Sequence, residues 1–160
     1  MSKDESVAFE VRVMIVEDHD RLCEVLQRIV AGTPGLSCCG SFNSGHETLA
    51  AIPDLRPDVI SIDLTMPDLN GLTVLKRIRE QWPEIRCVVF SGHADEAYVS
   101  ESFAAGAMGY IYKEDVNDFI EGVRVVAAGE YFLSPRVVDA MPDGIHSKPP
   151  TGSDPDNHAS

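Results

Sequence analysis

Short apolar runs rich in β-branched residues recur along the chain, and longer segments with a different hydrophobic spacing separate them. The first run, VRVMIV from Val11 to Val16, is typical of a β-strand. Four later runs have a similar length, although the second of the five is weaker. The predicted strands are residues 11–16, 36–42, 58–63, 85–90 and 107–112.

Between these runs, apolar residues recur every three or four positions, which is the spacing of one helix face. Leu22, Val25 and Leu26 begin such a face, and Gly32 and Pro34 are predicted to end that helix. The segment SGHE has capping-box spacing and begins the second helix, which we expect to end by Pro53. The predicted helices cover about residues 21–31, 44–53, 72–82, 95–105 and 116–127, and residues 129–135 are expected to finish the last one.

Five strand–helix units in succession predict an α/β fold with a parallel sheet. Parallel strands need crossover connections, and right-handed crossovers place helices on both faces of the sheet. A closed barrel of this kind needs eight units, and only five are present. We therefore expect an open, doubly wound, five-stranded parallel sheet.

Composition agrees with one globular domain and limits the classes of function. The 160 residues are 44% hydrophobic, and no apolar run approaches the roughly 18 residues that span a bilayer. The N-terminus, MSKDESVAFE, lacks the apolar core of a signal peptide, so we expect a cytoplasmic protein without membrane contact. The formal net charge of −13 argues against a nucleic-acid-binding surface. The four cysteines form no CxxC pair and are interpreted as small core residues.

The ends of the chain differ from the middle. Residues 1–9 are expected to be a flexible N-terminus, and residues 10–135 the folded domain. From residue 141 the sequence is poor in hydrophobic residues and rich in proline. Residues 136–160 are therefore predicted to be a linker and a disordered tail without an output domain.

Polar residues of an unusual kind follow four of the predicted strands. Glu17 and Asp18 follow the first strand, Asp63 ends the third, Ser91 follows the fourth and Lys113 follows the fifth. The carboxyl ends of parallel strands lie along one edge of the sheet, where open α/β sheets bind ligands. We therefore expect these side chains to converge.

Three carboxylates in one crevice repel one another and are costly to bury without partners. Lys113 supplies one positive charge, and Mg²⁺ is the cation that suits few protein oxygens and several waters. A carboxylate can also attack phosphorus and form an aspartyl phosphate. Asp63 is the candidate nucleophile, because it ends the central strand, and a nearby cation and Lys113 would stabilise the transferring group.

With these residues in place, the chain resembles the receiver domain of two-component response regulators. The resemblance covers roughly residues 10–135. Its motifs are VEDH, DLTMPDLNG, SGH and GYIYK, in this order. It implies a flavodoxin-like sheet with strand order 2-1-3-4-5, and a phosphorylation-dependent switch that signals through protein–protein contacts.

The resemblance also implies a role for each motif residue. Asp63 would accept a phosphoryl group from a histidine kinase or phosphotransfer protein. Asp18 and Asp63 would bind Mg²⁺ directly, with Glu17 acting through water and the backbone carbonyl of Thr65 completing the protein ligands. Ser91 and Lys113 would contact the phosphoryl group. Tyr110 would be the switch aromatic. Pro67 and Gly71 would shape the loop after the acceptor.

Two alternatives and several partners stay open at this point. The segment AAGEYFLSP resembles receivers that precede a helix-turn-helix domain, so the chain could be the receiver part of a DNA-binding regulator cut before that domain. An aspartate-nucleophile phosphohydrolase would usually carry a second Asp two residues after the first, where this chain has Thr65. An unknown downstream protein and a homodimer are both compatible with the sequence. Asp68 and Asn70 are interpreted as turn formers.

Overall fold

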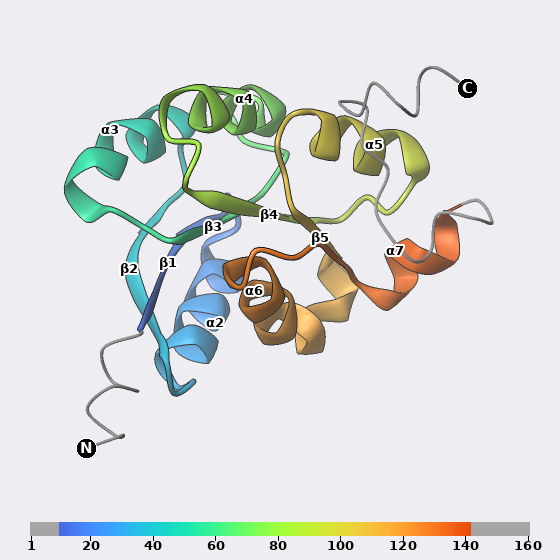
Figure 1. Cartoon of the computed structure of the whole chain (residues 1–160), viewed down its shortest axis with the longest axis horizontal. Helices are drawn as coiled ribbons and strands as arrows, with labels where there is room; N and C mark the ends of the chain where they lie inside the picture. The colour runs from blue at the N-terminus through green and yellow to red at the C-terminus, as the bar shows by residue number, and fades with distance from the viewer. Residues whose placement is uncertain (1–9, 142–160) are drawn as a thin grey trace.

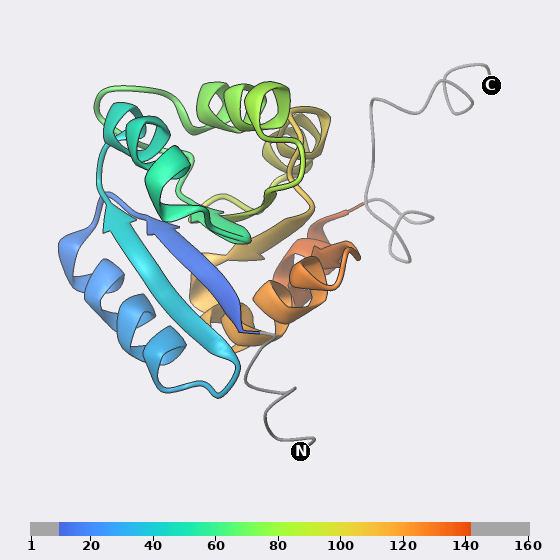
Figure 2. The ribbon, with the colours of Figure 1, turned by 60° about the vertical axis from the view of Figure 1, so that its left-hand side comes forward.

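The computed structural model describes residues 10–141, which form a parallel β-sheet with helices on both faces (Figures 1 and 2). The strand order is β2-β1-β3-β4-β5-β6. The strands are β1 (Val11–Val16), β2 (Leu36–Phe42), β3 (Val59–Ile62), β4 (Arg86–Ser91), β5 (Gly109–Tyr112) and β6 (Phe132–Leu133). The expected doubly wound fold and the order of the first five strands are confirmed.

The helices fall into two layers, one on each face of the sheet (Figure 1). They are α2 (Asp20–Ala31), α3 (Gly45–Leu55), α4 (Gly71–Gln81), α5 (Glu96–Ala104), the 3-10 helix η1 (Lys113–Asp118), α6 (Phe119–Ala127) and α7 (Pro135–Ala140). Because successive strand residues point to opposite faces, Met14 and Val16 join the core under α3, α4 and α5, while Val13 and Ile15 join the core over α2 and α6. No helix within residues 10–141 is long and apolar enough to cross a bilayer.

The second helix does not end by Pro53, as the sequence predicted. Helix α3 continues through Pro53 to Leu55 and ends where Arg56 takes a left-handed conformation, with φ 48°. A proline removes one backbone hydrogen bond from a helix. Ile52, which is 1% exposed, packs in the core at this point, and burial of the apolar face outweighs that loss.

The chain after α6 also differs from the prediction. Residues 129–135 do not finish the last helix. Gly129, with φ +89°, turns the chain back, and β6 then pairs in parallel with Gly109 and Tyr110 of β5 as a sixth strand. The fold continues past the predicted domain boundary at residue 135, because Val137 of α7 is fully buried and Met141 is 5% exposed. The predicted flexible residues 1–9 and the rest of the predicted tail, 142–160, lie outside the described residues.

Candidate functional site

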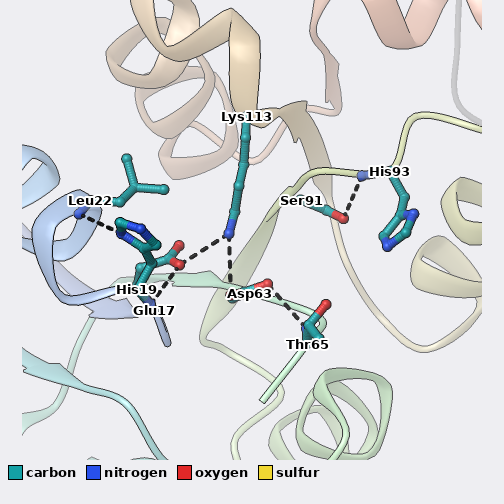
Figure 3. A network of polar contacts seen from close by, with 8 residues as sticks. All are labelled: Glu17, His19, Leu22, Asp63, Thr65, Ser91, His93 and Lys113. Carbon is teal, nitrogen blue, oxygen red and sulfur yellow. Dashed lines mark hydrogen bonds and ion pairs between the residues drawn. The ribbon is translucent and has the colours of Figure 1, made fainter.

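The polar residues expected to converge do lie at one edge of the sheet, at the ends of neighbouring strands (Figure 3). Backbone hydrogen bonds extend the sheet pairing to the two acidic residues that follow strands β1 and β3. The Asp63 N–H donates to the Val16 carbonyl at 2.9 Å, and the Glu17 N–H donates to the Phe42 carbonyl at 2.9 Å. The sheet therefore fixes the backbone of both acids.

Lys113 joins the two buried carboxylates. Its Nζ lies 3.0 Å from Oε2 of Glu17 and 3.3 Å from Oδ2 of Asp63, and Figure 3 shows it reaching between them. Glu17 is 1% exposed and Asp63 is 3% exposed. Two acids and one ammonium group in this small space carry a net negative charge, which favours a further cation.

The pKa values reflect this crowding. Burial, and after it the negative charge of Asp63, raise the pKa of Glu17 to about 7, against the opposing effect of Lys113. Burial alone would lower the pKa of Lys113, but the charges of Asp63 and Glu17 outweigh it and the pKa is raised. Lys113 is therefore a permanent cation near neutral pH, whereas Glu17 changes protonation there.

A cavity of about 290 Å³ opens above these groups. Its lining brings together Glu17, Asp18, His19, Asp63, Thr65, Gly92, His93 and Lys113. Asp18 is exposed at the cavity, whereas the side chain of Asp63 is buried at its base. The cavity thus gives a small ligand access to a buried carboxylate.

Ser91 and Tyr110 lie beside this cavity rather than in its lining. Both are fully buried. Oγ of Ser91 accepts a hydrogen bond from the His93 N–H at 3.1 Å, and the Tyr110 hydroxyl donates to the His93 carbonyl at 2.6 Å. Burial raises the pKa of Tyr110, so its hydroxyl keeps its proton. The imidazole of His93 stacks on the Tyr98 ring at 4.3 Å, so one loop residue connects strand β4, strand β5 and helix α5.

The loop after Asp63 is fixed by a hydrogen bond to the Asp63 side chain and by close packing of Gly71 against its backbone. Oδ1 of Asp63 accepts from the Thr65 N–H at 3.0 Å. A Cβ at Gly71 would lie 2.7 Å from the Leu64 Cα and 2.8 Å from the Asp63 carbonyl oxygen, so only glycine fits there. Pro67 lies in the same loop and lines a neighbouring cavity of about 290 Å³ with Tyr98.

Three polar residues near the site hold helix ends. Asp68 accepts from the N–H groups of Gly45 and His46, at 2.9 and 3.0 Å, at the start of α3. Asn70 caps α4 by accepting from the Leu72 N–H at 2.7 Å, and Nδ1 of His19 caps α2 by accepting from Leu22 N–H at 3.3 Å. The sequence interpretation of Asp68 and Asn70 as turn formers missed these caps, although both belong to residue types that favour caps.

The donor set fits a cation held largely by water. Oε1 of Glu17 is buried and has no hydrogen-bond partner, while Oε2 is shared by Lys113 and the His19 N–H. Within residues 10–141, no three His, Cys, Asp or Glu side chains are arranged to hold a metal by themselves. Mg²⁺ keeps several of its waters and needs few protein oxygens, so the carboxylates at the cavity are compatible with it.

The chain is similar in sequence to proteins of known function. Residues 13–124 match the family description "Response regulator receiver domain". The chain is 33% identical over 129 residues to the transcriptional regulatory protein DegU of Brevibacillus brevis, covering 80% of this chain and 55% of DegU. It is 30% identical over 132 residues to the response regulator GacA of Pseudomonas viridiflava, covering 82% of this chain and 62% of GacA. The chain thus spans little more than half the length of these relatives.

A solved structure agrees with the sequence relatives. The two-component response regulator of the LuxR family from Aurantimonas sp. SI85-9A1 superposes with a TM-score of 0.78 at 26% identity, covering 82% of this chain and 94% of that one. The chain therefore belongs to the response regulator receiver domain family.

Proposed function

We propose that this chain is a phosphorylation-dependent switch in which Asp63 accepts a phosphoryl group from a histidine kinase or phosphotransfer protein in the presence of Mg²⁺. The observation that carries this proposal is the pairing of buried Asp63 with Lys113 at the base of an open cavity. The phosphohydrolase alternative has no support from family membership, and Thr65 offers no carboxyl group for general acid chemistry.

The chemistry needs a nucleophile, charge neutralisation and a fixed position. A carboxylate oxygen of Asp63 attacks phosphorus, a P–O bond forms, and the bond from phosphorus to the donor nitrogen breaks. In a loose phosphoryl-transfer transition state, negative charge is spread over the phosphoryl oxygens. The ammonium group of Lys113 stabilises that charge. Glu17, Asp18, Asp63 and the Thr65 carbonyl would hold Mg²⁺, which supplies the rest of the neutralisation.

Signalling would follow from the new charge at Asp63. Lys113 and the hydroxyl of Ser91 would contact the phosphoryl oxygens, and Ser91 would exchange its bond with the His93 N–H for that contact. Tyr110, whose hydroxyl holds the His93 carbonyl, is the switch aromatic of this proposal. The face formed by α5 and β5 would then change its contacts with a downstream protein or with a second copy of the chain.

The test is to incubate the purified chain with acetyl phosphate and Mg²⁺ and to measure its intact mass. The wild type should gain one phosphoryl group and Asp63→Asn should gain none. Asp54→Asn, which removes an acid on helix α3 away from the cavity, is the matched control and should react like the wild type. A wild type that gains no mass under these conditions contradicts the proposal.

A second candidate is favoured by the relatives. DegU is a transcriptional regulatory protein, and this chain matches 55% of its length. The chain would then be the receiver part of a DNA-binding regulator. The formal charge of −13 gives no basis for DNA contact by the present residues. Sequencing the natural reading frame past Ser160 decides between the two, because a regulator of this kind continues into a helix-turn-helix domain. The cytoplasmic location stays a prediction.

A further inference from the structure

The last described segment, residues 129–141, packs on the outer side of strand β5, and we call it the C-terminal arm. Its strand β6 pairs in parallel with Gly109 and Tyr110, and its helix α7 packs against β5 (Figure 1). Val137 and Met141 are buried in the same core as Tyr110 and the apolar face of α5. The arm therefore covers the β5 edge next to the proposed switch aromatic.

The polar contacts of the arm gather on the residues that flank Lys113. Before Lys113, the Ser134 N–H donates to the Tyr110 carbonyl at 3.0 Å, and Oγ of Ser134 accepts from the Tyr112 N–H at 3.0 Å. After Lys113, the Arg136 N–H donates to Oδ2 of Asp115 at 3.1 Å. The backbone on both sides of Lys113 is thus tied to the arm.

The guanidinium of Arg136 adds a second set of contacts at the same turn. It pairs with Glu114 and Asp115 and lies 5.9 Å from the centre of the Tyr112 ring. The side chains of Arg136 and Glu114 are 56% and 63% exposed, so their pair contributes little by itself. Asp115 is 10% exposed at its side chain and Ser134 is fully buried, so these two provide the stronger anchors.

Lys113 must move when Asp63 carries a phosphoryl group or its mimic, a state that we call loaded. Its Nζ contacts Oδ2 of Asp63 and Oε2 of Glu17, and a phosphoryl group on Asp63 would occupy the space between the acid and the amine. The Lys113 backbone lies in the turn that the arm holds. A shift of Lys113 therefore has to be accommodated either in its own side chain or in the contacts between the turn and the arm.

We propose that docking of the C-terminal arm and loading of Asp63 oppose each other through the turn from Tyr112 to Asp115, so that the loaded protein releases the arm and uncovers the β5 edge. This rests on the proposed function of Asp63. Because coupling between two sites is reciprocal, a docked arm must weaken loading by the same factor by which loading weakens docking of the arm, so a variant with a loosened arm should load more tightly, by that factor at most. Arg136 and Ser134 are in this sense positioning residues for Lys113.

Amide hydrogen exchange by NMR tests the first half of this coupling. The full chain is measured with and without beryllium fluoride and Mg²⁺, the stable mimic of a phosphoryl group. The amides of Tyr112, Ser134 and Arg136 should exchange about two- to fivefold faster in the loaded protein, while those of the central strand β1 should not change. Loading of the wild type without faster exchange at these amides overturns the coupling alone. A wild type that does not load overturns the proposed function as well.

Two variants test the second half. Arg136→Glu places an acid against Glu114 and Asp115 at the surface, and Ser134→Ala removes the buried acceptor of the Tyr112 N–H. Either variant should bind beryllium fluoride about two- to fivefold more tightly than the wild type, because the gain in affinity is limited by the factor by which loading weakens docking of the arm. Arg77→Ala, at an exposed position on α4, is the control and should bind like the wild type.

The exchange rates also decide between the outcomes. A variant whose arm amides exchange faster before loading, yet whose affinity is unchanged or weaker, contradicts the proposal. If neither variant loosens the arm, the anchors do not hold it and the proposal also fails. Arg136→Glu replaces a side chain that is itself 56% exposed, so it remains informative if Ser134→Ala does not fold.

Discussion

At the scale of single residues, burial and the neighbouring Asp63 make the charged form of Glu17 unfavourable. It is buried beside Asp63, and its pKa is raised from 4.5 to about 7. A carboxyl group with a raised pKa in the folded state binds more protons there than in the unfolded state. Its contribution to stability is therefore fully present below pH 4.5 and is lost as the pH rises through 7.

We expect the free energy of unfolding in Mg²⁺-free buffer to fall between pH 5 and pH 7, by about 1–3 kcal/mol, because of Glu17. Glu17→Gln keeps the shape and removes the titration, so the difference between wild type and variant isolates the effect. Urea denaturation at several pH values measures it. A difference that does not change with pH would show that the charge of Glu17 is fully compensated by Lys113.

Gly71 gives a second prediction at this scale. A methyl group there meets the backbone of Leu64 and Asp63 at under 3.0 Å, so Gly71→Ala must displace the acceptor loop. We expect a loss of about 1–3 kcal/mol in the free energy of unfolding. At Gly92 an added Cβ has no heavy atom within 4 Å, so Gly92→Ala should change stability by less than about 0.5 kcal/mol. Equal losses in denaturation experiments would contradict the steric argument.

Residues that lie directly at strand ends could be predicted, and those that act through backbone contacts could not. Asp63, Glu17 and Lys113 converge because parallel strands end at one edge, which needs only the strand positions. His93 holds Ser91 and Tyr110 through its backbone N–H and carbonyl, groups that nearly every residue carries, so the SGH motif does not reveal this role. Spacing along the sequence therefore shows the charged groups of the site but not the frame that orients them.

At the scale of elements, Asp68 joins the acceptor loop to helix α3. Its carboxylate accepts from the Gly45 and His46 N–H groups and from the Ser44 hydroxyl, at 2.8 Å. These hydrogen bonds, the backbone ones first, hold the pKa of Asp68 well below its usual range. Since a lowered pKa stabilises the folded state above the unfolded pKa, this contribution is lost as the pH falls below about 4.

We therefore expect Asp68→Asn to lower the urea midpoint at pH 7 and to differ less from the wild type at pH 3. The amide keeps one acceptor oxygen but loses the charge that the start of α3 favours. Asp54→Asn, near the other end of the same helix, is the control and should leave the midpoint unchanged. A midpoint that does not respond to Asp68→Asn at either pH would show that the loop and α3 are joined by packing alone.

The elements that the sequence mispredicted share a cause. Pro53 and the segment after Gly129 were interpreted from local signals, and in both places long-range contacts decide the outcome. Burial of Ile52 in the core outweighs the hydrogen bond that Pro53 removes from the helix. Strand β6 forms only because the edge of β5 lies beside it. Local propensity cannot show a partner from another part of the chain.

At the scale of the whole molecule, the C-terminal arm tests how far the cooperative unit extends. Val137 and Val138 are neighbours in α7, with the same helix propensity, but Val137 is fully buried and Val138 is not. Val137→Ala should cost about 1–3 kcal/mol through the cavity that it leaves, and Val138→Ala clearly less. If residues 10–141 unfold as one unit, the loss appears wherever unfolding is observed.

Trp82, the chain's single tryptophan, follows helix α4 and so reports from a different part of the molecule. Its fluorescence in a urea titration should show the full loss caused by Val137→Ala, with the same midpoint as circular dichroism. A loss visible by circular dichroism but absent from Trp82 fluorescence would mean that the arm melts separately. In that case the arm could detach without weakening the remaining fold, and its docking could be regulated at little cost to stability.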